Sequence, residues 1–287
     1  MPRTAYVNGR YVPLAQAAVH IEDRGYQLAD AVYEVWAVFG GRLADAEGHF
    51  ARLQRSLGEL RIPTPMSRQA LTTVLKEVLR RNRINEGLIY LQISRGVAPR
   101  DHAFPAEATA PAVVITAKPV DRAATEAKAA LGVSVITQPE NRWGRCDIKT
   151  VGLLPNVLAR QAAREQGAAE AWFVDPDGLV TEGASSNAWI VDRNGVLRTR
   201  DTRANILRGV TRLTLLDVIA QAGLTVEERA FTPQEAKEAQ EAFITGAGSL
   251  VLPVTRIDGA LVGTGEAGPV AKRLRSLYIE RARATAI

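Results

Sequence analysis

Alternating and helically spaced hydrophobic residues divide the first 120 residues into strands and helices that follow one another without regular alternation. The segments "AYVNGRYVP" and "VYEVWAVFGGRL" (32–43) predict strand pairs around tight turns. Helical spacing runs through 47–60 and again through 67–82, where Ser67 suits the N-cap position. "GLIYLQIS" and "APAVVITA" are rich in β-forming residues and predict further strands. This order predicts an α+β domain over residues 1–120.

A change of pattern follows in "AKPVDRAATEAKAA" (117–130), which combines a proline, charges and alanines and is interpreted as a linker. We place the domain boundary near residue 121, so that 121–287 form a second domain. There, "GVSVITQ" predicts a strand, and a helix is expected from Pro155 to Gly167. Two Asp-x-x-Gly turns between β-rich runs and an amphipathic helix over 209–223 follow. The second domain therefore mixes strands and helices in the α/β manner.

Composition narrows the class of protein. The chain has 287 residues, of which 46% are hydrophobic and 23% charged, values typical of a globular protein. No apolar run approaches the roughly 18 residues of a membrane span, and the N-terminus lacks the apolar segment of a signal peptide. The single cysteine, Cys146, excludes an intrachain disulfide and favours a reducing, cytoplasmic location.

Charge and histidine content argue against two further kinds of ligand. The net charge of +5 is spread among acids, and its densest cluster, "KRLRSLYIERAR", is typical of the exposed face of an amphipathic helix, so nucleic-acid binding is not expected. The three histidines His20, His49 and His102 lack metal-ligand spacing, so no metal site is expected.

One lysine occupies an unusual position. In "RCDIKTVGLLPN", Lys149 lies between apolar and small residues, which indicates an amine shielded from water. A neutral lysine amine is a nucleophile, and shielding or a nearby cation increases the neutral fraction. If the backbone of residues 145–149 is extended, Arg145 and Asp147 point to the same side as Lys149. The alternative is a strand-end lysine whose stem is buried and whose charge stays in water.

Three other patterns carry possible chemistry. The helix start at Gly209, Val210 and Thr211 suits a phosphate, because its first N–H groups lack partners within the helix. Glu182 in "VTEGASSN" could pair with a protonated ring nitrogen. The loop "SRGVAPRDHAFP" carries Arg100, two residues before His102, and arginine binds carboxylates through a fork of donors. Each pattern also fits an ordinary role as a helix cap, a strand-end loop or a solvated loop. Together with a lysine nucleophile they match the needs of pyridoxal 5'-phosphate acting on an amino acid.

Seven blocks of sequence resemble one enzyme family over nearly the whole chain. They are "EDRGYQLADAVYEV", "HFARL", "PRDHAFP", "RCDIKTVGLLPNVLA", "TEGASSN", "ILRGVTR" and "FITGAGSLVLPV". In order and spacing they resemble the fold-type IV, class IV aminotransferases that depend on pyridoxal phosphate, and among these the D-amino acid aminotransferases. The resemblance implies two domains with the cofactor site between them.

The resemblance also implies roles for individual residues. Lys149 corresponds to the lysine that forms the Schiff base and moves the proton, and Glu182 to the acid that pairs with the pyridine nitrogen. The remaining cofactor-binding residues implied are Arg52, Val210 and Thr211 at the phosphate, Leu207 against the ring, and backbone N–H groups near Ala247.

For the substrate, the family traps the α-carboxylate with a tyrosine and an Arg-x-His pair, which correspond to Tyr33, Arg100 and His102. In the family this loop reaches in from the partner subunit, so a homodimer is implied. Val35 and Ala37 share a strand face with Tyr33, and their small size suits D-alanine. The implied reaction moves an amino group between D-amino acids and 2-oxo acids such as 2-oxoglutarate or pyruvate.

Some positions depart from the family pattern. Ala29 and Ala31 replace glycines, which we interpret as a packing difference, and Gly246 and Ala247 replace hydroxyl residues that bind phosphate in some relatives. Three other functions stay open. They are a branched-chain L-aminotransferase, a lyase such as aminodeoxychorismate lyase, and a non-catalytic protein that binds a phosphate ligand.

Overall fold

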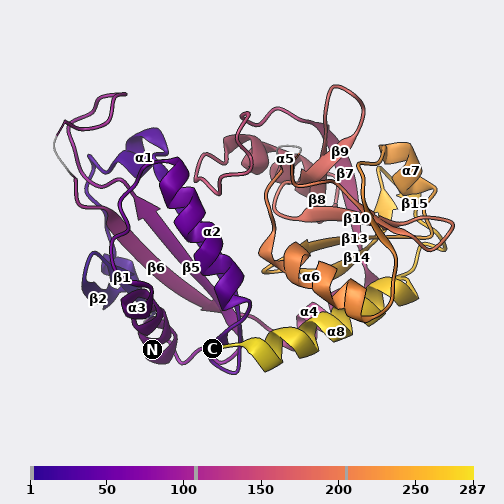
Figure 1. Cartoon of the computed structure of the whole chain (residues 1–287), viewed down its shortest axis with the longest axis horizontal. Coiled ribbons are helices and arrows are strands. Elements are labelled where there is room, and N and C mark those ends of the chain that lie inside the picture. Colours follow the sequence, from indigo (N-terminus) through magenta and orange to yellow (C-terminus); the bar gives the residue numbers. More distant parts are fainter. Residues whose placement is uncertain (1–2, 107–108, 204–205) are drawn as a thin grey trace. The chain divides into compact units, whose positions relative to one another are not determined.

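The computed structural model describes residues 3–106, 109–203 and 206–287. The chain divides into two compact units (Figure 1). The first comprises Met1–Asp121, Ile148–Gly152 and Thr285–Ile287, and the second comprises Arg122–Asp147 and Leu153–Ala284. The short segment with Lys149 thus groups with the first unit.

The first unit is built on an antiparallel sheet in the order β2-β1-β6-β5-β3-β4. Its strands are β1 (Thr4–Val7), β2 (Arg10–Pro13), β3 (Ala31–Phe39), β4 (Arg42–Leu43), β5 (Gly87–Ser94) and β6 (Ala112–Pro119). Its helices are the 3-10 turn η1 (Leu14–Gln16), α1 (Arg24–Leu28), α2 (Ala46–Glu59) and α3 (Arg68–Arg81). The strands and helices predicted for residues 1–120 are confirmed, including Ser67, whose side chain caps α3.

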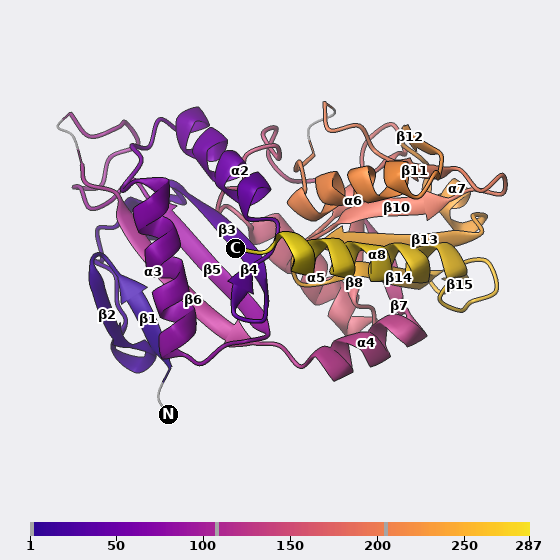
Figure 2. The same cartoon turned by 60° about the horizontal axis from the view of Figure 1, so that its bottom comes forward.

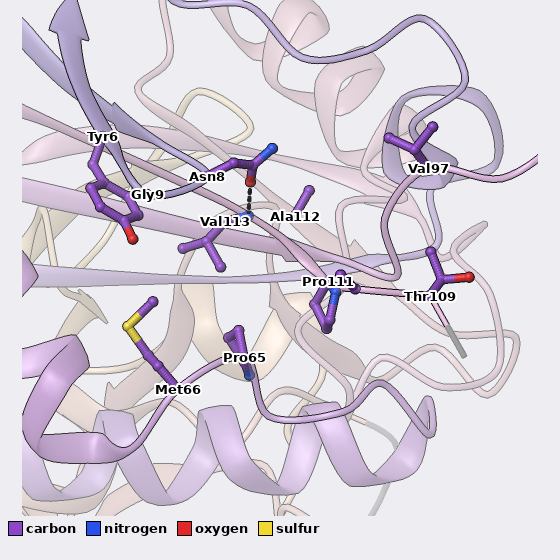
Figure 3. A pocket seen from close by; sticks show the side chains of 11 residues that line it. Tyr6, Asn8, Gly9, Pro65, Met66, Val97, Thr109, Pro111, Ala112 and Val113 are labelled. Carbon is purple, nitrogen blue, oxygen red and sulfur yellow. Dashed lines mark hydrogen bonds between the residues drawn. The ribbon is translucent and has the colours of Figure 1, made fainter. Parts of the chain in front are cut away.

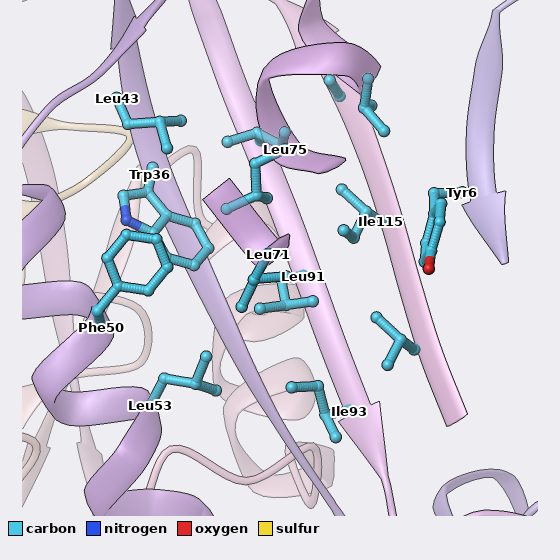
Figure 4. Packing of buried hydrophobic residues seen from close by; sticks show 14 of the residues in the cluster. Tyr6, Trp36, Leu43, Phe50, Leu53, Leu71, Leu75, Leu91, Ile93 and Ile115 are labelled. Atoms are coloured by element: carbon cyan, nitrogen blue, oxygen red, sulfur yellow. The ribbon is translucent and has the colours of Figure 1, made fainter. Parts of the chain in front are cut away.

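Helices α2 and α3 cover one face of this sheet, and the core lies beneath them (Figure 4). Strand alternation sends Trp36 of β3 to this face, where Phe50 and Leu53 of α2 and Leu75 of α3 pack. On the opposite face Tyr33 and Val35 of β3 are half-buried, whereas Ala37 and Phe39 are buried. The sheet therefore has one sealed face and one face that is less covered.

The second unit contains a larger, mixed sheet in the order β12-β11-β10-β13-β14-β7-β8-β9, with β15 paired to β14 (Figure 2). Its strands are β7 (Val133–Pro139), β8 (Glu170–Val174), β9 (Val180–Gly183), β10 (Asn187–Val191), β11 (Leu197–Thr199), β12 (Val226–Glu228), β13 (Glu241–Gly246), β14 (Leu250–Ile257) and β15 (Ala260–Leu261). Its helices are α4 (Arg122–Leu131), α5 (Leu154–Glu165), α6 (Val210–Gln221), α7 (Pro233–Lys237) and α8 (Pro269–Thr285). Pairs β7–β8, β7–β14 and β11–β12 are parallel and the others are antiparallel, which confirms the mixed class.

Two predictions about local structure are wrong. Residues 117–130 are not an open linker, because β6 continues to Pro119 and α4 begins at Arg122. At Ala29 the difference from glycine-bearing relatives is not one of packing, since the residue is exposed and its φ of 56° lies in the left-handed region that glycine adopts without strain. Ala31, in contrast, is fully buried.

No helix within the described ranges combines the length and the apolar character that a membrane span requires.

Candidate active site

Lys149 is held against the edge of β3 in the first unit. Its carbonyl oxygen accepts a hydrogen bond from Tyr33 N at 3.0 Å, and Val151 N donates to Ala31 O at 3.2 Å. The side chain is half-buried, and Nζ lies 4.1 Å from the centroid of the Tyr33 ring. The preceding residue, Ile148, is part of the sealed core. The amine therefore lies against an aromatic face, and its half-buried position fits both the shielded amine and the strand-end lysine considered from the sequence.

The extended interpretation of the residues before Lys149 is wrong. Residues 144–147 form turns, and Arg145 Nε donates to Asp147 Oδ1 at 2.9 Å. Arg145 is exposed and pairs with Asp147 within the same turn, so it does not share a strand face with Lys149.

Arg52 is positioned by a buried acid that the sequence analysis did not single out. Glu34 of β3 is fully buried on the helix-covered face and accepts hydrogen bonds from Arg52 Nε at 2.8 Å and Nη2 at 2.7 Å. His49 Nδ1 lies 2.7 Å from Glu34 Oε2. Burial raises the pKa of Glu34, but the charge of Arg52 and the hydrogen bonds from Arg52 and His49 outweigh it and hold the pKa at about 2. An ionised carboxylate thus orients the guanidinium at physiological pH.

The less covered face of the first sheet carries the side chains predicted to meet the substrate. Tyr33 and Val35 lie on it and are half-buried, and strand pairing sets Val35 opposite Tyr90 of β5. The Tyr33 and Tyr90 rings lie 5.6 Å apart, and Tyr90 Oη donates to Gln92 Oε1 at 2.7 Å. Burial and the neighbouring Tyr33 raise the pKa of Tyr90 to about 12, so its hydroxyl remains protonated. This face offers a small apolar floor beside hydroxyl donors.

Arg100 and His102 lie in the loop between β5 and β6, and both side chains are exposed. Among the described residues no hydrogen bond joins either side chain to Tyr33. The structure therefore places them on the first unit but does not bring them together with the tyrosine of the predicted carboxylate trap.

In the second unit, Glu182 at the end of β9 is buried and accepts hydrogen bonds from three donors. Arg142 Nη1 lies 2.7 Å and Leu207 N 3.1 Å from its Oε1, and Asn187 Nδ2 lies 3.0 Å from its Oε2. Donors of this kind stabilise the ionised form of a carboxylate. Glu182 is thus an acceptor within a polar network, which suits pairing with a protonated ring nitrogen. The loop-glutamate alternative, an exposed side chain, is wrong.

Asn187 connects the predicted cofactor residues of the second unit, although the sequence analysis did not name it. Its Nδ2 also donates to Leu207 O at 3.0 Å, and strand pairing sets it opposite Thr245 of β13. A Cβ at Gly209 would lie only 2.0 Å from Asn187 Oδ1. Only a glycine therefore lets the start of α6 approach this side chain.

The start of α6 has the features of an anion site. Gly209 is the N-cap and offers no side-chain hydrogen bond, so the N–H groups of the first turn have no side-chain cap. Val210 and Thr211 are both buried there. Ala247 lies half-buried in the turn that follows β13. The prediction that these glycine, valine and threonine residues open a helix is confirmed.

A cavity of about 470 Å³ lies elsewhere, against the β1–β2 turn of the first unit (Figure 3). None of the predicted site residues lines it. Within the described ranges, no group of three or more His, Cys, Asp or Glu side chains is arranged to hold a metal ion.

Solved structures similar to this one have the fold-type IV architecture. A branched-chain amino acid aminotransferase of Escherichia coli matches with a TM-score of 0.89 and 25% identity, covering 98% of this chain and 95% of that chain. The branched-chain amino acid aminotransferase of T.th., solved with pyridoxamine 5'-phosphate, matches with a TM-score of 0.88 and 27% identity, covering 98% and 94%. The two-domain fold-type IV class expected from the sequence is confirmed.

Sequence comparison then fixes the family. The pattern of the class IV amino-transferases matches residues 31–257. A D-alanine aminotransferase of Bacillus licheniformis is 42% identical over 269 residues, covering 94% of this chain and 93% of that protein. The D-alanine aminotransferase of Staphylococcus haemolyticus is 36% identical over 278 residues, covering 96% and 97%. The chain belongs to the class IV aminotransferases.

Proposed function

We propose that this enzyme transfers amino groups between D-amino acids, D-alanine among them, and 2-oxo acids such as 2-oxoglutarate or pyruvate. The observation that carries the proposal is the half-buried amine of Lys149 against the Tyr33 ring, in a chain 42% identical to a D-alanine aminotransferase.

The residues present fit pyridoxal 5'-phosphate. The uncapped start of α6 at Val210 and Thr211 in the second unit suits its phosphate. Arg52 of the first unit is assigned to the phosphate through the resemblance of "HFARL" alone. Glu182 suits a protonated pyridine nitrogen, because it is a buried acceptor within a polar network. Leu207 would support the ring, and backbone N–H groups near Ala247 would complete the phosphate site. When bound, the cofactor accepts the electron pair that is left when the substrate loses its α-proton.

Lys149 performs the proton transfer in this proposal. Its Nζ removes the proton from the substrate Cα as a general base, a contribution of about 10²–10⁴-fold to the rate. The Tyr33 ring limits the directions that the amine can take, which favours one face of the substrate.

Substrate recognition is assigned to the less covered sheet face and the β5–β6 loop. Arg100 and His102 would bind the α-carboxylate with the Tyr33 hydroxyl, while Val35 leaves room for a small side chain. The handedness of the substrate would follow from which side the carboxylate occupies, because that choice turns the Cα–H bond toward or away from Lys149.

The proposal includes a homodimer in which this loop serves the partner subunit, in a reducing, cytoplasmic setting. Helix α5 supports an interface, since Leu154, Val157 and Leu158 on one of its faces are 69%, 58% and 60% exposed. A chain with a single, buried cysteine suits a reducing compartment.

A branched-chain L-aminotransferase is the second candidate, favoured by the two solved structures named above. Turnover of D-alanine and of L-leucine, each with 2-oxoglutarate, separates the two. We expect D-alanine to react and L-leucine to react far more slowly, and the opposite result would assign the second function. A lyase would turn over neither amino acid in this assay, because forming pyruvate from D-alanine requires an amino acceptor.

A Lys149→Ala variant tests the mechanism, with Lys118→Ala, an exposed lysine of β6, as the matched control. We expect loss of turnover and of the borohydride-sensitive visible absorbance of the bound cofactor in the first variant and neither loss in the control. Turnover at the wild-type rate in Lys149→Ala would refute the assignment, and absence of the absorbance from the wild type would favour a non-catalytic binding protein.

A further inference from the structure

The loop that carries Arg100 and His102 is closed at its base. Gly96 has a φ of 104°, and a Cβ there would lie 2.1 Å from Ala110 O, so only glycine allows the two ends of the loop to meet this closely. The first end is also fastened to the segment before β3, because Arg24 N donates to Gly96 O at 2.9 Å and Ser94 Oγ donates to Asp23 Oδ2 at 2.7 Å. The first end of the loop is therefore fixed by hydrogen bonds, and the second end lies close against it.

A buried ion cluster stands beside this base. Arg24 and Arg95 are 3% and 5% exposed, and both bind Asp30. Arg95 does so with two nitrogens, Nε at 2.6 Å and Nη2 at 2.9 Å, and its guanidinium also donates to Leu60 O at 2.7 Å. The planar guanidinium cannot rotate without losing several of these bonds at once.

Each arginine of the cluster also contacts the loop itself. Arg24 Nη1 donates to Asp101 O at 2.7 Å, and Asp101 stands between Arg100 and His102. The Arg95 guanidinium lies 3.7 Å from the centroid of the Phe104 ring, two residues after His102. One contact thus falls between the two residues assigned to the substrate carboxylate, and the other falls two residues after the second of them.

The two ends of the loop are not held by apolar packing on the side that faces the α2–α3 connection. There Val97, Thr109 and Pro111 line the cavity of about 470 Å³, across which lie Pro65 and Met66 (Figure 3). The two ends of the loop border the cavity on that side, so the loop depends more on the hydrogen bonds and the ring contact made by Arg24 and Arg95.

We propose that Arg24, Asp30, Arg95 and Phe104 are positioning residues that hold the Arg100–His102 loop in the geometry that binds the substrate carboxylate. The inference rests on the proposed function and adds to it a group of residues that never touch substrate. Because a bound carboxylate is held equally before and during the reaction, weakening these anchors raises KM more than it lowers kcat.

Phe104 offers the safest test, because its side chain is 46% exposed and its removal leaves the core intact. In Phe104→Leu we expect KM for D-alanine to rise about fivefold, the factor that corresponds to about 1 kcal/mol, with kcat nearly unchanged. Phe104→Tyr keeps a ring over Arg95 and is expected to restore the wild-type KM.

The matched control is Tyr11→Leu, which removes another ring beneath an arginine of the same unit, since Arg81 lies 4.2 Å from the Tyr11 ring centroid. It should leave KM unchanged. An unchanged KM in Phe104→Leu, or an equal rise in the Tyr11 variant, overturns the inference while wild-type turnover of D-alanine leaves the proposed function standing. A wild type that does not turn over D-alanine overturns both.

Discussion

Replacing Glu34 by glutamine tests whether the Arg52 guanidinium is held by charge. The substitution keeps the shape of the side chain but removes the anion that accepts hydrogen bonds from Arg52 Nε and Nη2 and from His49. The half-buried Arg52 would then lose the counter-charge that the buried Glu34 supplies. We expect a less stable protein and weaker retention of the phosphate cofactor.

The magnitude follows from the pKa of Glu34, which falls from 4.5 to about 2 in the folded protein. This shift corresponds to about 3 kcal/mol of stability at pH 7, and breaking a buried ion pair typically costs about 3–5 kcal/mol. Because the folded-state pKa is the lower one, the contribution is present above pH 4.5 and is lost as the pH falls through about 2. About 2 kcal/mol of it should be gone at pH 3.

Denaturant unfolding of wild type and Glu34→Gln at pH 7 and pH 3 measures this difference. The gap between them should be about 3 kcal/mol at pH 7 and clearly smaller at pH 3. Burial lowers the pKa of His49 more than Glu34 raises it, so His49 destabilises the wild type below about pH 6.5 and destabilises Glu34→Gln more strongly, because the variant lacks the contribution of Glu34. Both proteins therefore carry His49→Gln in this comparison, which removes the His49 titration from the gap.

Glu77→Gln is the matched control. The pKa of Glu77 is also held at about 2, by hydrogen bonds from Arg80 and Arg81, but these partners are exposed to water on α3. Solvent screens such pairs, so this variant should change stability far less. Equal losses in both variants, or a gap for Glu34→Gln that does not depend on pH, would show that charge does not hold Arg52.

Three further outcomes are expected. Gly209→Ala should weaken cofactor retention about tenfold on dialysis, because its Cβ would displace Asn187; unchanged retention would contradict the assigned site. Burial raises the pKa of Cys146 to about 11, so alkylation by iodoacetamide at pH 8 should be slow, and rapid labelling of the native protein would refute that environment. Ala29→Gly should raise the free energy of unfolding by up to about 1 kcal/mol, whereas Ala127→Gly in α4 should lower it by about 1 kcal/mol.

Strands and helices whose hydrophobic residues recur at a regular spacing were predictable from the sequence. The errors arose where the interpretation relied on local composition instead of on that spacing. Alternation in "VYEVWAVF" gave β3 and its two faces, because the side-chain period of a strand is fixed by its backbone. In contrast, the alanine-rich segment after Pro119 was interpreted as a linker although alanine is the best helix former, and it folds as α4. The charged residues before Lys149 form turns because Arg145 and Asp147 pair locally.

The parts of the site that escaped prediction are those defined by partners distant in sequence. Glu34 could have been suspected, because strand alternation places an acid on the buried face between Val32 and Trp36, and a buried carboxylate requires a cation. The helix that supplies that cation, however, begins only after the β3–β4 turn, and nothing in its own pattern distinguishes Arg52 from a solvent-facing arginine.

The role of Asn187 was harder to predict from its neighbours in sequence than that of Glu34. An asparagine at the start of a strand is usually a turn residue, so its sequence context gave no signal. Its role arises because β10 sets it opposite Thr245 while its amide reaches Glu182 and Leu207, and because Gly209 leaves room for its oxygen. The asparagine therefore requires a glycine at 209, and the proposed phosphate site would require one too. The two explanations separate experimentally: restoring cofactor binding to Gly209→Ala by Asn187→Ala would assign the glycine to the side chain, and failure to restore it would assign the glycine to the anion.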